Sequence, residues 1–305
     1  MTGAPVPEGA DTILPIETAK LQKSEMVIRK PIQSKHIHKK GEELKVGEVV
    51  LRKHTIICPA TIGLLVSLGV RQINVFKKPR VSLLTTGTEL ASRGTRLASG
   101  KIYDSNLGML RAALQDMGLR PVTAKSVRDD VRPLKNAVHR ALERSDVLIV
   151  TGGVSVGDYD FARKVFSELE ISEIFWKVSQ KPGKPLYFGK SGKRLVFGLP
   201  GNPAAAYTCF YEYVFPALRW MMGHKRGELP SEEIVLGVDV KADRARTLFL
   251  KAKTKLVHRV REVFSLKHQG SHMISSLCEA DSFMVVRPRQ TPYRKGEIIR
   301  VDYLK

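Results

Sequence analysis

Between residues 80 and 223 the apolar positions follow two alternating periods, one typical of strands and the other of helices. Apolar runs in 80–86, 147–150 and 193–199 each lead into a glycine turn, as buried strands do. The helical period follows the first run, where Asp104-Ser105-Asn106 is a capping sequence and Gly118 a stop signal. The inward face of that helix would carry Leu107, Leu110, Leu114 and Met117.

A second strand–helix unit follows directly. A strand is predicted at 122–127, and Asp129 and Asp130 come next, where they would cap a helix. Further helices are predicted at 161–169 and 204–222. The helix that follows Asp129 and Asp130 would carry Leu134, Val138, Ala141 and Leu142 on its inward face. This alternation predicts an α/β fold, a central parallel sheet covered by helices on both faces.

The flanking segments have a different pattern. Residues 1–41 hold short β-like pieces at 12–16 and 26–28, which favours the remnant of a small β-rich domain. Residues 42–78 hold a helix that starts at Pro59 and closes at Gly69, as in a linker or dimerisation domain. We expect the α/β domain to span 79–224. Residues 225–305 contain short alternating runs at 234–240, 247–252, 282–287 and 298–301. These runs predict the strands of a small barrel or sandwich.

The glycine loop at 151–160 carries the clearest chemistry. Glycines let the backbone approach a ligand closely, and free N–H groups at the start of the next helix attract phosphate or another anion. The loop also carries the carboxylates of Asp158 and Asp160, which suit a magnesium-assisted reaction on a phosphorylated substrate. The plainer alternative is a turn that only ends a strand. In a sheet of this class, ligands bind beyond the carboxyl ends of the strands, where Thr86, Glu89, Asp129, Asp160 and Pro200 all fall.

Composition adds few constraints. The chain has 305 residues, 43% of them hydrophobic, which suffices for about two domains with cores of their own. No apolar run approaches the ~18 residues of a membrane span, and the first residues lack a signal-peptide pattern, so we expect a soluble, cytoplasmic protein. Cys58, Cys209 and Cys278 are too scattered for a disulfide framework or a zinc site, and small buried side chains are the expectation.

The net charge of +21 raises a nucleic-acid alternative. Basic runs occur at 29–30, 35–40 and 77–80, spread along the chain rather than gathered with aromatic residues. No helix-turn-helix, zinc-finger or RNA-binding fingerprint is present. We therefore predict solvated surface charge, part of which steers anionic substrates. A nucleic-acid role would show as binding that falls steeply with salt.

Six short motifs follow one another in the order seen in one known family. They are Thr2-Gly3-Ala4-Pro5-Val6-Pro7, Thr86-Gly87-Thr88-Glu89-Leu90, Ile102-Tyr103-Asp104-Ser105-Asn106, the 152–160 loop, Trp176-Lys177 with Lys181-Pro182-Gly183-Lys184-Pro185, and Gly198-Leu199-Pro200-Gly201-Asn202-Pro203. At these residues the chain resembles the molybdopterin molybdotransferase family, the MoeA and gephyrin E-domain group. That resemblance implies insertion of molybdate into adenylated molybdopterin, with magnesium and release of AMP. It further implies a homodimer, with a molybdopterin adenylyltransferase as a possible partner.

The resemblance also implies the roles of residues. Glu89, Asp129 and Asp160 would hold magnesium and act in catalysis, although a plain helix cap is the alternative for Asp129. Lys181 and Lys184, on either side of a Pro-Gly turn, would present ammonium groups to molybdate or phosphate. The plainer alternative is that they are solvated, as lysines in a loop usually are. Trp176 is expected to be a packing residue. The residues expected to bind substrate are Thr2, Thr86, Gly152, Gly153, Ser155, Lys177, Lys181, Lys184, Pro200, Asn202, Pro203, Arg246 of an Arg-x-x-Phe motif and Ser271 of a Gly-Ser turn.

Two departures from the family modify these expectations. The resemblance begins abruptly at Thr2, whereas the family extends further on the N-terminal side, so an N-terminally shortened member with weaker dimerisation and slow metal insertion is expected. Glu43 stands where the family usually has aspartate. A noncatalytic pterin-binding scaffold of the same fold is therefore the alternative to the enzyme.

Overall fold

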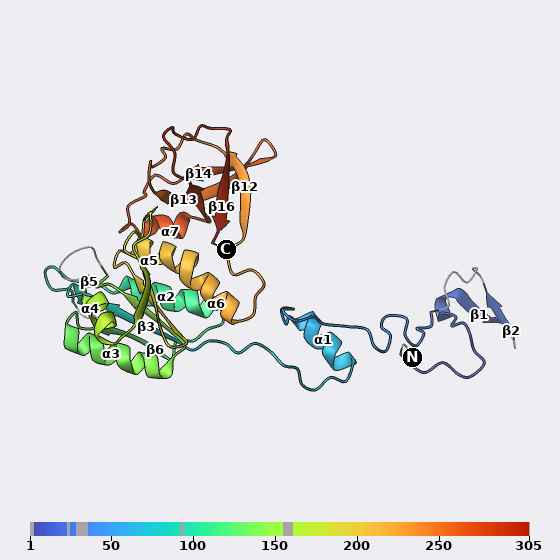
Figure 1. Cartoon of the computed structure of the whole chain (residues 1–305). Coiled ribbons are helices and arrows are strands. Elements are labelled where there is room, and N and C mark those ends of the chain that lie inside the picture. Colours follow the sequence, from blue (N-terminus) through green and yellow to red (C-terminus); the bar gives the residue numbers. More distant parts are fainter. Residues whose placement is uncertain are drawn as a thin grey trace. The chain divides into compact units, whose positions relative to one another are not determined.

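The computed structural model describes residues 3–22, 25–28, 36–91, 94, 96–154 and 161–304. The chain divides into two compact units, Met1–Thr55 and Ile56–Lys305, whose elements are labelled in Figure 1. Among the described residues, no helix combines the length and the apolarity that a bilayer crossing requires.

The first unit contains one β-hairpin. Strand β1 (Ala19–Gln22) pairs antiparallel with β2 (Glu25–Ile28), after a 3-10 turn η1 at Ile16–Thr18. The strand expected at 26–28 is confirmed within β2. The β-like piece expected at 12–16 is wrong, because residues 12–15 are irregular and Ile16 opens the 3-10 turn. Pro15 has no N–H to donate to a strand ladder.

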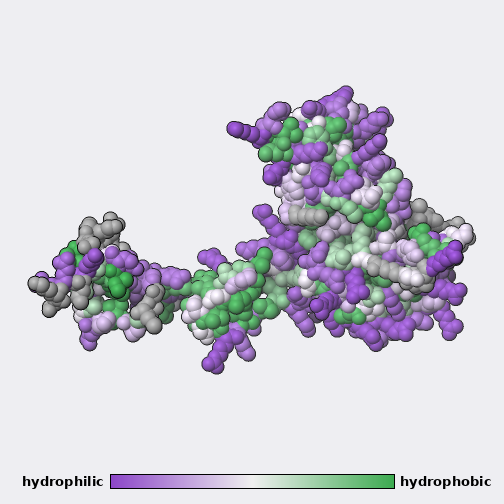
Figure 2. Space-filling view, turned by 180° about the vertical axis from the view of Figure 1, so that it is seen from behind, coloured by the Kyte–Doolittle hydropathy of each residue, from purple (hydrophilic) through white to green (hydrophobic). Residues whose placement is uncertain are grey.

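The second unit begins with the predicted helix α1 (Pro59–Ser67), which has proline in its first turn and Gly69 at φ +70° beyond its end. Only Thr61 and Leu65 of this helix are buried. Apolar residues are exposed along it and beside it, and this region is green in Figure 2, whereas hydrophilic residues cover most of the visible face of the rest of the unit.

The central sheet has the strand order β6-β3-β7-β11-β10-β8. Its strands are β3 (Val81–Thr86), β6 (Thr123–Val127), β7 (Val147–Thr151), β8 (Ser172–Trp176), β10 (Tyr187–Ser191) and β11 (Arg194–Leu199). The first four in spatial order are parallel, as predicted, but β10 is antiparallel to both of its neighbours. The sheet is therefore mixed. Two residues, with Gly192 at φ +59°, join β10 to β11, and so short a connection permits only an antiparallel hairpin.

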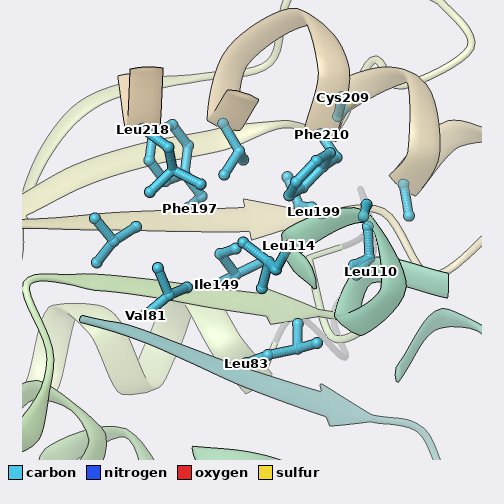
Figure 3. Packing of buried hydrophobic residues seen from close by; sticks show 14 of the residues in the cluster. Val81, Leu83, Leu110, Leu114, Ile149, Phe197, Leu199, Cys209, Phe210 and Leu218 are labelled. Atoms are coloured by element: carbon cyan, nitrogen blue, oxygen red, sulfur yellow. The ribbon is translucent and has the colours of Figure 1, made fainter. Parts of the chain in front are cut away.

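Helices cover both faces of this sheet. On one face lie α2 (Ser105–Asp116), α5 (Pro203–Cys209), the π-helical turn η2 (Phe210–Val214) and α6 (Phe215–Met221); on the other lie α3 (Val131–Arg144) and α4 (Phe161–Glu168). Alternate residues of each strand enter opposite cores: Leu83 packs with the first set of helices (Figure 3), and Leu84 packs with the second. Burial on both faces explains the continuous apolar runs of these strands. The predicted inward faces of α2 and α3 are confirmed, because every named residue packs in a core, with Leu107 and Met117 partly buried.

Residues 231–303 form a closed five-stranded barrel, so the barrel rather than the sandwich is present. Its strands are β12 (Ser231–Leu236), β13 (Thr247–Val257), β14 (Val260–Ser265), β15 (Ser282–Val286) and β16 (Ile298–Tyr303). They follow the order β14-β12-β16-β15-β13, and pairing of β13 with β14 closes the ring. A further strand, β9 (Gln180–Lys181), leaves the central domain and pairs parallel with β13, and α7 (Ser275–Glu279) precedes β15.

Three local expectations differ from the structure. Asp130 is the N-cap residue of α3, but its side chain makes no capping hydrogen bond, and Asp129 bonds elsewhere. The helix expected at 204–222 is interrupted by the π-helical turn. Cys209 is buried as expected, whereas Cys58 and Cys278 are exposed.

Candidate functional site

A pocket of about 660 Å³ lies at the carboxyl ends of β3, β7 and β11. These ends meet at one edge of the sheet because the three strands are parallel. Eight of the predicted site residues line the pocket: Thr86, Glu89, Asp129, Gly152, Gly153, Pro200, Asn202 and Pro203. The structure therefore brings together residues from four separate segments of the chain.

Thr86 and Asp129 connect two neighbouring strand ends. The Thr86 hydroxyl, at the end of β3, donates a hydrogen bond of 2.8 Å to Oδ1 of Asp129, which follows β6. This contact draws the Asp129 carboxylate to the pocket wall and away from the α3 N-terminus. Asp129 is thus a pocket residue rather than a helix cap.

Glu89 supplies a second carboxylate to the same wall. Its side chain folds back over Gly87, where an added Cβ would lie 2.7 Å from Glu89 Oε2. Hard oxygen donors of this kind suit magnesium, so the two acids fit that ion. In the part of the chain that the structure describes, no group of three or more metal-ligating side chains occurs. Asp160, the third expected ligand, lies outside the described residues, as do Thr2 and Ser155.

Glycine is required where the loop after β7 passes Thr86. Gly152 has φ +89°, and a Cβ there would lie 1.9 Å from the Thr86 carbonyl oxygen. Gly153 has φ +64°, and its Cβ would lie 3.2 Å from the Thr86 methyl group. Both backbone conformations disfavour other residues. The glycines therefore let the pocket floor pack against β3.

Two buried polar residues of the pocket, Asp104 and Asn106, were identified from sequence only as helix-capping residues and as part of a family motif. Asp104 does cap α2 by accepting a 2.9 Å hydrogen bond from Leu107 N, and it also accepts one from the Thr85 hydroxyl. Asn106 Nδ2 donates to Thr151 Oγ1 at 3.0 Å and to the Gly201 carbonyl at 2.7 Å. Within the described residues, Asn106 Oδ1 is buried without a hydrogen-bond partner.

The predicted lysines do not line this pocket. Lys181 and Lys184 are exposed on either side of the Pro-Gly turn, although the next residue, Pro185, is a lining residue. Lys177 lies with its Nζ 3.8 Å from the centroid of the Trp176 ring. Trp176 is partly buried and packs against the core on the α3 side, as expected of a packing residue.

A buried hydrogen-bond network supports the turn at residues 181–184, called the lysine turn below. Gln180 is 2% exposed; its Nε2 donates to the Pro182 carbonyl at 2.9 Å, and its Oε1 accepts from Tyr213. The Cys209 thiol lies 3.6 Å from the Gly183 carbonyl oxygen, and burial raises the pKa of that thiol. This network holds the turn against η2 and α5.

Neither of the two predicted barrel residues, Arg246 and Ser271, is among the residues that line the pocket. Arg246 pairs with Asp243 at 2.7 Å, which lowers the pKa of that carboxyl to about 2. Arg246 directly precedes β13, whose Thr247 pairs with Gln180, the residue before the lysine turn. Ser271 accepts a 2.9 Å hydrogen bond through its carbonyl from Ala204 N, and its neighbour His272 lines the pocket. His272 was missed, although it directly follows the Gly-Ser turn.

The fold and the pocket define a class: an α/β ligand-binding protein whose strand-end pocket is completed by a loop of a β-barrel. Family profiles divide the chain in the same order. Residues 82–220 match a "probable molybdopterin binding domain", 1–69 the "MoeA N-terminal region (domain I and II)" and 233–304 the "MoeA C-terminal region (domain IV)".

Individual proteins agree over nearly the whole chain. It is 32% identical over 302 residues to a molybdopterin molybdenumtransferase of Staphylococcus aureus (strain Mu50), covering 99% of this chain and 72% of that protein. It is 34% identical over 290 residues to molybdopterin molybdenumtransferase 2 of Mycobacterium tuberculosis (strain H37Rv), covering 93% and 71%. A crystal structure of the molybdopterin biosynthesis MoeA protein from Pyrococcus horikoshii superposes with a TM-score of 0.79 at 28% identity, covering 98% and 73%. The chain therefore belongs to the molybdopterin molybdenumtransferase family, and these similarities favour neither the scaffolding nor the nucleic-acid alternative.

Proposed function

We propose that this chain inserts molybdate into the dithiolene of adenylated molybdopterin and releases AMP, as a step of molybdenum cofactor biosynthesis. The observation that carries the proposal is the pocket at the parallel strand ends, which Thr86, Glu89 and Asp129 line together with the glycines at 152–153. The sequence identity of 32% and 34% to two molybdopterin molybdenumtransferases, over nearly the whole chain, supports the proposal.

In this proposal the pyrophosphate of the substrate lies beside Gly152 and Gly153, both of which line the pocket. Glu89 and Asp129, together with Asp160, would be the residues that hold magnesium. Magnesium, when bound, neutralises charge that develops on the phosphate oxygens. The Thr86 hydrogen bond would keep the Asp129 carboxylate in place to bind magnesium.

Cationic residues outside the pocket lining attract molybdate and the substrate phosphates in this proposal. They are Lys177, Lys181, Lys184 and Arg246, three of them close in sequence and the last beside β13, which pairs with the lysine turn. The remaining contacts to substrate are assigned to Thr2, Ser155, Pro200, Asn202, Pro203 and Ser271. The excess of basic residues over the chain, +21 in total, favours steering of such anions.

The organisation around the site is part of the same proposal. We divide the chain at 1–41, 42–78, 79–224 and 225–305. The breaks between the matched family regions support the boundaries at 79 and 225. A homodimer in the cytoplasm, supplied by a molybdopterin adenylyltransferase, follows from the family resemblance.

The test is incubation of the full chain with molybdopterin-AMP, magnesium and molybdate, followed for AMP release. We expect release that depends on both magnesium and molybdate, and a sharp loss in Glu89→Gln. Glu233→Gln, which removes an exposed carboxylate of β12, is the matched control and should equal the parent. A parent that releases no AMP contradicts the proposal; equal rates in the parent and Glu89→Gln contradict the role of Glu89.

A further inference from the structure

Lys251 on β13 is a buried lysine outside the pocket lining. It is 3% exposed, and its Nζ donates hydrogen bonds to the carbonyls of Gly270 at 3.1 Å and Met273 at 3.3 Å. Burial lowers the pKa of this ammonium. A buried charge is costly unless its hydrogen bonds are made, so the position of Lys251 needs an explanation beyond packing.

The two carbonyls that Lys251 binds are the ends of one tight turn. Met273 N donates to the Gly270 carbonyl at 3.1 Å, which closes the turn over Ser271 and His272. The ammonium therefore binds the open side of the turn, at its first and last residues. Ser276 also donates to the Met273 carbonyl, at 3.1 Å, from α7.

Gln269 ties the segment before the turn to the same residue. Its Oε1 accepts from Lys251 N at 2.9 Å, and its Nε2 donates to the Lys251 carbonyl at 2.8 Å. Nε2 also donates to the Leu266 carbonyl at 2.8 Å. Both the backbone and the side chain of Lys251 thus hold residues 266–273, which form no strand or helix of their own.

The central residues of the turn reach the pocket domain. His272 lines the pocket beside Asn202 and Pro203, and the Ser271 carbonyl accepts the hydrogen bond from Ala204 N at the start of α5. The turn is therefore held from the barrel by Lys251 and from the central domain by α5. A shift of the turn would move His272 at the pocket wall.

We infer that Lys251 is a positioning residue, which holds the 270–273 turn and so fixes His272 at the wall of the substrate pocket. This inference rests on the proposed function, because adenylated molybdopterin is the substrate that the wall would contact. Lys251 acts through the turn and makes no contact of its own with the pocket.

The test compares Lys251→Met, which keeps the length of the side chain but removes its charge and donors, with the matched control Lys253→Met. Lys253 lies two residues further along the same face of β13 but is exposed. Lys251→Arg, which keeps charge and donors, is the rescue variant. Amide hydrogen exchange of the full chain is measured without substrate, and KM and kcat for molybdopterin-AMP are measured separately.

In Lys251→Met we expect exchange of amides 270–274 to accelerate about 10-fold or more while the other barrel strands stay protected. KM should rise about 10-fold with a smaller change in kcat, because a wall contact to the substrate is displaced. Lys251→Arg should recover part of both effects, and Lys253→Met should match the parent.

Unchanged exchange at 270–274 together with an unchanged KM overturns the inference. Faster exchange spread evenly over the barrel also overturns it, since that outcome marks a purely structural lysine. A parent without AMP release, combined with accelerated exchange at 270–274 in Lys251→Met, overturns the proposed function but supports the role of Lys251 in holding the turn.

Discussion

The hydroxyl of Thr86 donates a 2.8 Å hydrogen bond to the carboxylate of Asp129, 43 residues further along the chain. Thr86 is the last residue of β3 and Asp129 follows β6, the adjacent parallel strand, so the two carboxyl ends lie side by side. Asp130, the next residue, is exposed at the N-cap of α3 and makes no capping hydrogen bond. Neighbouring aspartates therefore have different environments, and only Asp129 lines the pocket.

Asp129→Asn should lower kcat for AMP release about 100-fold, because a magnesium-directed carboxylate stabilises the transition state by several kcal/mol. The asparagine keeps the shape and can still accept the Thr86 hydrogen bond, so the melting temperature should stay near that of the parent. Asp130→Asn is the control and should retain the parent rate. Comparable rates in the two variants would remove Asp129 from the proposed magnesium site.

Lys181→Ala and Lys184→Ala should each raise the molybdate concentration that gives half-maximal activity. The effect should be larger at low ionic strength, because screening there is weakest. Lys190→Ala, an exposed lysine on β10 beyond the turn, is the control. Steady-state kinetics over a range of salt concentrations measure the effect, and an unchanged molybdate requirement in both variants rejects the oxyanion role.

Gly152→Ala should destabilise the fold by about 2 kcal/mol or more and distort the pocket, because the new Cβ would meet the Thr86 carbonyl at 1.9 Å. Gly192→Ala is the matched control, since Gly192 also has positive φ but has nothing within 4 Å of an added Cβ. In Gly192→Ala the free energy of unfolding should fall by only about 1 kcal/mol. Chemical denaturation of both variants separates the clash from the backbone cost; equal losses would argue against the close approach.

Glu212 of the π-helical turn should make stability depend on pH. Burial, reinforced by Asp302 and opposed by Arg300, raises its pKa from the ordinary 4.5 to about 8, and its Oε1 has no hydrogen-bond partner among the described residues. The folded state therefore binds this proton more tightly than the unfolded state. The resulting stabilisation is present below the unfolded pKa and is lost as pH rises from about 4.5 to about 8.

Glu212→Gln should flatten this decline and raise the free energy of unfolding above the window by about 1–3 kcal/mol. Urea denaturation at pH values below and above the window measures the difference. Glu233→Gln, which removes an exposed carboxylate on β12, should keep the slope of the parent. A parent slope retained in Glu212→Gln would assign the pH dependence to other groups.

The sequence by itself determined the strand–helix alternation of the central domain. Strands buried on both faces must be apolar throughout, and surface helices must be apolar on one side, so both periods are visible without tertiary information. The β-rich character of residues 225–305 followed in the same way, and so did the candidate site residues at the ends of β3, β7 and β11. Most of those candidates line one pocket, because parallel strands bring their carboxyl ends to the same edge.

The tertiary structure decided what depends on contacts between distant segments. The antiparallel β10 and the closure of the barrel depend on strand pairing, which local periodicity does not encode. Asp129 could be taken for a helix cap because its partner Thr86 is remote in sequence. Lys251 gives no sign of burial in a basic strand; only folding places the Gly270 and Met273 carbonyls against its ammonium. Local patterns report which face of an element is apolar, whereas the partners of polar side chains are set by which segments the fold brings together.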